Sequence, residues 1–147
     1  MLNLRNFDLF DNELVSSIFQ ISLEEANSMI EKWNTGIFNG SYFEMFAVQN
    51  TDIGSIVGTI SLYEHSKSIV SIGPEIFKEY RRRGFARAAM LEAMKIAKQK
   101  NYKIALQQIR TDNEASIRLH ELLGFERDTC VYKNRKGNDV FIYLKII

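Results

Sequence analysis

Apolar side chains recur every three or four residues along three segments, which predicts three helices. In the longest, residues 84–100, apolar positions form one face and charged side chains occupy the other. A second helix, residues 22–36, begins with Ser22 and Glu25 at the capping-box spacing. A third covers residues 113–123 and ends at Gly124. The apolar face of the longest helix consists of Ala86, Ala89, Met90, Ala93, Met94 and Ala97.

Runs of alternating or continuous apolar residues predict strands in the remaining segments. These runs are residues 1–10, an expected edge strand, and 42–48, 56–63, 69–76, 103–110, 125–132 and 140–147. The second and third runs predict a hairpin, and so do the last two. Gly73-Pro74 interrupts the run 69–76, and because proline cannot donate to a sheet ladder we expect a bulge or bend there. The element order predicts an α/β (α+β) fold with a sheet of mixed direction.

Composition and charge exclude several classes of protein. The chain has 147 residues, 46% of them hydrophobic, which suits one domain over residues 1–147. Because the formal net charge is +1, we expect no binding to nucleic acid or membranes through overall charge. No apolar run is long enough to cross a bilayer and no basic-then-apolar leader begins the chain, so we expect a cytoplasmic protein. One cysteine and two histidines predict neither a disulfide nor a metal site.

The densest charge lies between the predicted strand 69–76 and the predicted helix 84–100. The cations there are Lys78, Arg81, Arg82, Arg83 and Arg87, against the single acid Glu79. A helix N-terminus leaves backbone N–H groups unpaired, and Gly84 allows a ligand to approach the backbone closely. Guanidinium groups bind phosphate oxygens through paired hydrogen bonds. The segment therefore predicts a pyrophosphate site, with a solvated basic turn as the alternative.

Two sequence blocks resemble the GNAT superfamily of acetyl-CoA-dependent N-acetyltransferases. Arg81-Arg-Arg-Gly84-Phe-Ala86 resembles the family signature (Gln/Arg)-x-x-Gly-x-(Gly/Ala), and Ile76 precedes it where the family has the end of its central strand. Downstream, Asn113-Glu-Ala-Ser116-Ile-Arg-Leu-His120-Glu-Leu-Leu-Gly124-Phe125 resembles the family's Asn-x-x-Ala/Ser…Leu-Tyr/His-Glu-x-x-Gly-Phe helix. The resemblance implies a mixed, mostly antiparallel central sheet that is splayed at the cofactor site and flanked by helices.

The same resemblance implies acetyl-CoA as co-substrate and assigns residues to it. The backbone around Ile76, Phe77 and Lys78 would pair with the pantetheine arm as a further strand. On the later helix, Asn113 and Ser116 share a face with His120 and would line the cofactor sulfur. The pyrophosphate would be held by the backbone amides of Arg81, Arg82, Arg83, Gly84, Phe85 and Ala86.

Two residues are candidates for catalysis. His120 stands where much of the family has a tyrosine taken as the general acid, and a histidine there is similar to the phosphinothricin-type amino-acid acetyltransferases. An imidazole exchanges a proton near neutral pH, although packing beneath the C-terminal hairpin is an equal alternative for His120. Glu75, beside the expected opening, is the candidate base.

The choice of base stays open because this chain departs from the family pattern. Where some members carry a strand glutamate, this sequence has Val70 and Ser71 on one strand and Gln108 on another. Glu64 with His65 at the end of the preceding strand is a further substitute, acting through water. Alignment of the amine with the thioester, together with backbone N–H donors to the carbonyl, is expected to account for most of the lowering of the activation barrier.

The resemblance implies direct transfer of an acetyl group to a primary amine within a ternary complex. A small amino-acid-like amine is favoured as acceptor, followed by a protein N-terminus or a lysine. Trp33, Phe38, Tyr42, Phe43 and the loop 134–138 would shape the acceptor pocket. One alternative is an acyl-CoA sensor without turnover, which an assay for amine-dependent thiol release would distinguish. The other, an arginine patch for RNA, is disfavoured by the small net charge.

Overall fold

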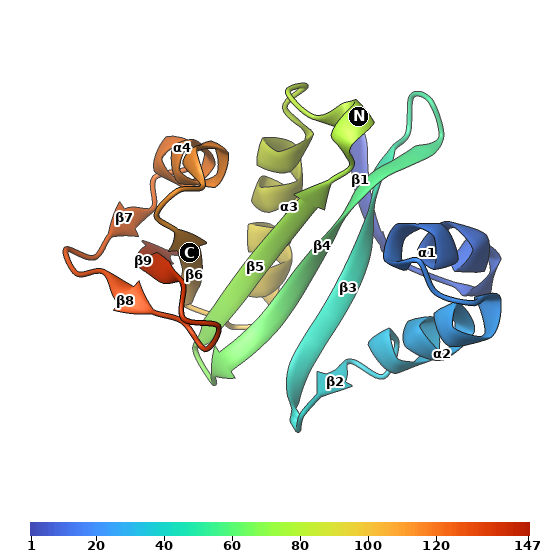
Figure 1. The fold of residues 1–147 in the computed structure, drawn as a ribbon, viewed down its shortest axis with the longest axis horizontal. Coiled ribbons are helices and arrows are strands. Elements are labelled where there is room, and N and C mark those ends of the chain that lie inside the picture. The colour runs from blue at the N-terminus through green and yellow to red at the C-terminus, as the bar shows by residue number, and fades with distance from the viewer.

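A mixed sheet of nine strands forms the centre of the computed structural model, which describes residues 1–147 (Figure 1). Its main strand order is β1-β3-β4-β5-β6-β9-β7, with β2 paired to β3 and β8 to β9. Every neighbouring pair is antiparallel except β5 and β6. The strands are β1 (Leu2–Asn6), β2 (Ile37–Phe38), β3 (Ser41–Asn50), β4 (Ser55–Ser66), β5 (Ile69–Ile76), β6 (Ile104–Arg110), β7 (Glu126–Arg127), β8 (Tyr132–Lys133) and β9 (Asp139–Ile146). The predicted mixed, mostly antiparallel sheet is confirmed.

Helices cover both faces of this sheet. The helix α3 lies behind β4 and β5, whereas α1 and α2 pack beside β3 on the opposite face (Figure 1). Two apolar cores result, a large one under α3 and a small one under α1 and α2. The helices are α1 (Asn12–Phe19), α2 (Leu23–Trp33), α3 (Phe85–Gln99) and α4 (Glu114–Leu122), with 3-10 turns η1 (Leu9–Asp11) and η2 (Lys78–Tyr80). None of the helices has both the length and the apolar character needed to cross a bilayer.

The elements with strong local signals form where the sequence predicts them. Ser22 caps α2 by accepting a hydrogen bond from the backbone N–H of Glu25 at 3.0 Å, and Glu25 bonds back to Ser22. The predicted bounds of β5 match the structure, as do the β3–β4 hairpin and the edge position of β1.

Two parts of the chain differ from the prediction. The expected strand 125–132 is two short strands, β7 and β8, because the chain bends between them. Asp128 holds this bend by accepting a hydrogen bond from the Tyr132 hydroxyl at 2.7 Å. The helix α1 is absent from the prediction because the chain turns at Asp8, whose side chain caps η1, and the expected edge strand therefore ends at Asn6.

Candidate active site

The parallel strands β5 and β6 separate soon after they begin. They pair only at Ile69↔Ile104 and Val70↔Ala105, whereas β6 pairs with β9 along its other edge from end to end. Beyond these pairs, residues 71–76 of β5 and 106–110 of β6 form two diverging edges, which we call the fork (Figure 1). The predicted splayed sheet is confirmed.

Gly73-Pro74 explains the fork in a different way from the predicted bulge. The chain is not bulged there, because β5 stays in register with β4 through Gly73↔Ser61 and Pro74↔Ile60. Backbone groups of successive strand residues point to opposite edges, and the N–H of Phe77 bonds to β4. Pro74, three residues earlier, therefore faces the fork. Its missing N–H lies on the edge where a ladder to β6 would need it.

The loop at the outer end of the fork exposes a run of backbone donors. Arg82 has φ +63° and Gly84 has φ +82°, and α3 begins immediately afterwards. The backbone N–H groups of residues 82–87 have no acceptor in the protein, and the first N–H that does is Ala88, bonded to the Gly84 carbonyl at 3.1 Å. A Cβ on Gly84 would meet no atom within 4 Å, so this face of the loop is open. Such a run of N–H groups at a helix N-terminus suits a phosphate anion.

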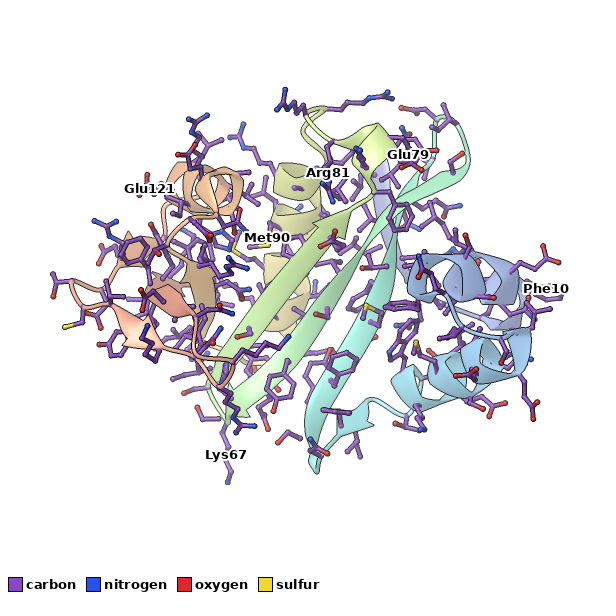
Figure 2. All side chains as sticks on the ribbon, in the orientation of Figure 1. Phe10, Lys67, Glu79, Arg81, Met90 and Glu121 are labelled. Carbon is purple, nitrogen blue, oxygen red and sulfur yellow. The ribbon has the colours of Figure 1, made fainter.

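The arginines of this loop have different surroundings. Arg81 folds back toward the end of β5, as Figure 2 shows, and its Nε donates to the carbonyl oxygen of Ile76 at 2.8 Å. Its Nη2 pairs with Glu75 Oε1 at 3.1 Å. Arg82 and Arg83 make no ion pair and remain exposed beside the free N–H groups. Of the three arginines at residues 81–83, these two therefore have guanidinium groups available to an anion.

The three residues predicted to pair with the pantetheine arm differ in whether their backbone groups face the fork. The backbone of Ile76 faces the fork, but its carbonyl already accepts from Arg81. The N–H of Phe77 is bonded to Val57 on β4, and the carbonyl of Lys78 accepts from the N–H of Arg81 at 3.4 Å. Of the three, only Ile76 presents its backbone to the fork.

The helix α4 brings Asn113, Ser116 and His120 together, as its spacing predicts. Asn113 caps the helix by accepting from the N–H of Ser116 at 3.1 Å. The His120 ring is 1% exposed and lies 4.9 Å from the ring of Phe125 and 6.2 Å from that of Tyr143. These are the contacts of a packed side chain, and catalysis by His120 stays a prediction.

The hydrogen bonds of His120 show which ring nitrogen carries the hydrogen. Because its Nδ1 lies 2.8 Å from the carbonyl oxygen of Ser116, Nδ1 carries the hydrogen and Nε2 is the bare nitrogen. Nε2 is buried without a partner. Burial lowers the pKa of His120 below its ordinary value of 6.5, so the ring is neutral at neutral pH. A general acid working through Nε2 would need the charged ring, which this environment disfavours.

Replacement of His120 by phenylalanine should flatten the pH dependence of stability. The unfolded chain binds a proton at the ordinary pKa and the folded chain does not, so the free energy of unfolding falls as the pH drops below about 6.5. One linked proton contributes at most about 1.4 kcal/mol per pH unit. Urea unfolding of the wild type and His120→Phe between about pH 7.5 and 5.5 measures the two slopes. Equal slopes would contradict the buried, neutral assignment.

The aromatic residues expected around the acceptor lie in three places. Trp33 packs into the small core under α1 and α2, and Tyr42 stacks in the large core on the α3 side. Phe38 and Phe43 lie together, with ring centroids 5.9 Å apart, and Phe43 stands opposite Tyr63 on the other face. Trp33 and Tyr42 are only half-buried against these cores, and the prediction that all four residues shape one acceptor pocket stays a prediction.

One group at the fork has no counterpart among the predicted catalytic residues. Ser71, the first β5 residue beyond the last pair, donates from Oγ to the carbonyl oxygen of Leu106 at 2.7 Å. His65 Nε2 lies 2.6 Å from the same Oγ. From the sequence, His65 is expected only as a substitute base acting through water, because no local signal shows that the His65 and Ser71 side chains meet.

Comparison with known proteins agrees with this geometry. The profile of the acetyltransferase (GNAT) family matches residues 8–125. The SPbeta prophage-derived uncharacterized N-acetyltransferase YokL of Bacillus subtilis (strain 168) is 26% identical over 128 residues, which cover 83% of this chain and 70% of that protein.

Solved structures share the fold at low sequence identity. A probable acetyltransferase has a TM-score of 0.83 at 20% identity, covering 99% of this chain and 92% of its own. A ribosomal-protein alpha-N-acetyltransferase in complex with coenzyme A has a TM-score of 0.82 at 17% identity. The match covers 99% of this chain and 94% of that one. Spermidine N-acetyltransferase from Vibrio cholerae in complex with CoA and spermine has a TM-score of 0.80 at 18% identity. The match covers 99% of this chain and 95% of that one.

Proposed function

This chain belongs to the GNAT acetyltransferase family and is an acetyl-CoA-dependent N-acetyltransferase, and from that premise we propose that it acetylates a primary amine by direct transfer in a ternary complex. The observation that carries the proposal is the run of free backbone N–H groups at residues 82–87 beside the fork. A donor site for an anion and an unpaired strand edge are the two features that a phosphate-bearing, amide-containing substrate requires.

The residues of the loop and the fork divide the binding between them. The free N–H groups of residues 82–87, with Arg82 and Arg83, would hold the two phosphates. The unpaired edge of β5 spans five residue steps from Ser71 to Ile76, about 17 Å at the usual rise per residue, and would pair with the extended arm. Bound acetyl-CoA supplies the activated acyl group and a thiol leaving group.

The transfer itself is proposed to depend mainly on alignment. The α4 residues Asn113 and Ser116 bond within their own helix, so they give no sign of proton transfer. Glu75 is 67% exposed and paired with Arg81, which makes a direct role as base dependent on breaking that pair. Holding an amine against a thioester can contribute about 7–11 kcal/mol to lowering the barrier.

The acceptor is proposed to be a small amino-acid-like amine, with a protein N-terminus or a lysine as the next candidates. The first rests on the resemblance of the Ser116–His120 block to phosphinothricin-type enzymes. The structural neighbours named for spermidine and for a ribosomal protein add a polyamine and a peptide N-terminus to the compounds to be tested. Phe38, Phe43 and Tyr63 offer an apolar wall for such an acceptor on one face of the sheet.

Steady-state kinetics tests direct transfer. Thiol release from acetyl-CoA, measured with amino acids, spermidine and an N-terminal peptide, is expected only when an acceptor amine is present. Double-reciprocal plots should intersect, as in a ternary complex. Parallel lines with a stoichiometric thiol burst in the absence of amine would instead indicate an acyl-enzyme. Because Cys130 is the only cysteine and is exposed, Cys130→Ser is the control, and it should retain full activity.

A further inference from the structure

Three groups are hydrogen-bonded in series at the closed end of the fork. His65 Nε2 lies 2.6 Å from Ser71 Oγ, and Ser71 Oγ lies 2.7 Å from the carbonyl oxygen of Leu106. Ser71 and Leu106 are the first residues beyond the last β5–β6 pair. An arm that starts at the Gly84 loop and runs along the whole fork ends at this point. The series therefore stands where the proposed function puts the acyl group and the acceptor.

We propose that Ser71 and His65 form a relay that removes the proton from the acceptor amine and passes it to solvent. The proposal rests on the proposed transfer to an amine and names the base of that reaction. Ser71 would contact the amine, and His65 would act through Ser71.

An irregularity of β4 brings His65 into position. Glu64 pairs with Val70 and Ser66 pairs with Ile69, so His65 is an extra residue without a partner on β5. A bulge of this kind redirects the side chain of the extra residue. The His65 ring lies edge-on to Tyr63 with centroids 5.6 Å apart, which limits its rotation. The ring thus points along the sheet toward Ser71.

The proton count of the series permits two hydrogen-bond arrangements, and the one with a bare Nε2 can take up a proton from Ser71. A serine hydroxyl has one hydrogen, so when Ser71 donates to Leu106 the imidazole must donate from Nε2. In the other tautomer Nε2 is bare, and Ser71 donates to it instead. Both arrangements keep the imidazole neutral. Converting one into the other needs rotation of the hydroxyl and movement of the imidazole hydrogen between Nε2 and Nδ1, which the exposed ring makes by exchange with water.

The proposed step balances in protons and electrons. An N–H bond of the ammonium breaks while Ser71 Oγ gains that proton and gives its own hydrogen to Nε2 of His65. The amine keeps the electron pair, which attacks the thioester carbonyl. The thiolate leaves and takes up the second N–H proton of the attacking nitrogen, so the products are the amide and the free thiol. The imidazolium then releases its Nδ1 proton to water, because His65 is exposed. One proton leaves per acetyl group transferred, and nothing is oxidised or reduced.

The charged groups around His65 do not replace it. Its neighbour Glu64 accepts a hydrogen bond from Tyr102 at 2.8 Å, and Lys67 extends away from the sheet at the tip of the next turn, as Figure 2 shows. The side chains of Arg135 and Lys136, in the turn between β8 and β9, make no ion pair or hydrogen bond with His65. His65 is thus the titratable group bonded to Ser71 at the closed end of the fork.

Two substitutions separate a relay from a structural link. In His65→Gln the side-chain amide can still donate to Ser71 but takes up no proton, and Ser71→Ala removes the hydroxyl. Near pH 7 and with an acceptor of pKa about 10, each should lower kcat about 100-fold, in the range usual for acid–base catalysis. The affinity for coenzyme A, measured by calorimetry, should not change. Ser61→Ala, which removes a hydroxyl two strand pairs away, is the matched control and should keep the wild-type rate.

The pH dependence of kcat identifies the relay. The loss in both variants should shrink to about threefold when the pH approaches the pKa of the amine, because the acceptor is then already neutral. A loss that is the same at every pH, or a wild-type rate in His65→Gln, would overturn the relay while leaving the transferase intact. Wild-type protein that binds coenzyme A but releases no thiol with any amine would contradict the proposed function, and the relay with it.

Discussion

Gly84→Glu should reduce the affinity for coenzyme A by about 100-fold or more. Gly84 has φ +82° in the middle of the free N–H groups, and its missing side chain leaves that face open. A glutamate there would place a carboxylate among the donors proposed for the phosphates. Each lost hydrogen bond to a charged group costs about 1.5–3 kcal/mol, and every 1.4 kcal/mol is tenfold in affinity, so two lost bonds suffice. Calorimetric titration with coenzyme A measures the change.

Two further variants separate the parts of this effect. Gly84→Ala adds a methyl group in open space, and its main cost is the positive φ, about 1–2 kcal/mol. Gly40→Glu introduces the same charge at φ +79° in a turn away from the loop, where a Cβ also meets nothing within 4 Å. We expect a modest loss of affinity for coenzyme A in Gly84→Ala and normal affinity in Gly40→Glu. Normal binding by Gly84→Glu would contradict the proposed phosphate site.

The elements that the sequence predicts well are those specified by neighbouring residues. The capping box of α2 lies within four residues, and the apolar face of α3 repeats along a single helix. The phosphate loop belongs to the same group, because a glycine before a helix and a cluster of arginines are local features. Its backbone donors follow from the position of Gly84 alone.

The arrangement of polar groups depends on strand register, which local patterns do not contain. His65 meets Ser71 because a bulge changes the β4–β5 pairing by one residue. The sequence shows an alternating run there and gives no sign of the bulge. Likewise, Gly73-Pro74 indicates that pairing is disturbed but not on which edge, and the structure places the disturbance toward β6. Long-range pairing decides both results.

A side chain assigned from a motif can also meet an unexpected environment. His120 matches a family position associated with catalysis, yet its ring is enclosed by Phe125 and Tyr143 and its pKa is lowered by burial. Arg81 belongs to the signature of the loop, yet its guanidinium bonds to the end of β5. Residue type and spacing predict which segment carries the chemistry. Burial and hydrogen-bond partners decide which atoms are free to perform it.

Gly58→Ala should destabilise the fold by about 1–3 kcal/mol, the usual range for overpacking a core. Gly58 is buried on β4, and the backbone of β5 approaches it closely. A Cβ at this position would overlap the carbonyl oxygen of Glu75 and lie 2.9 Å from Ile76 Cα. Because these are backbone atoms of the neighbouring strand, no side-chain rotation relieves the overlap. The strands must move apart, and chemical denaturation should show a lower midpoint with an unchanged slope.

The displaced segment is the outer end of the fork, so the same substitution should weaken coenzyme A binding. Gly73→Ala is the matched control, because its Cβ would meet only the Ser61 hydroxyl at 3.1 Å, an atom that can rotate away. We expect a smaller loss of stability for Gly73→Ala than for Gly58→Ala. If both variants unfold at the same midpoint as the wild type, β4 and β5 are not held at the observed separation. The edge proposed to pair with the pantetheine arm would then be adaptable rather than preformed.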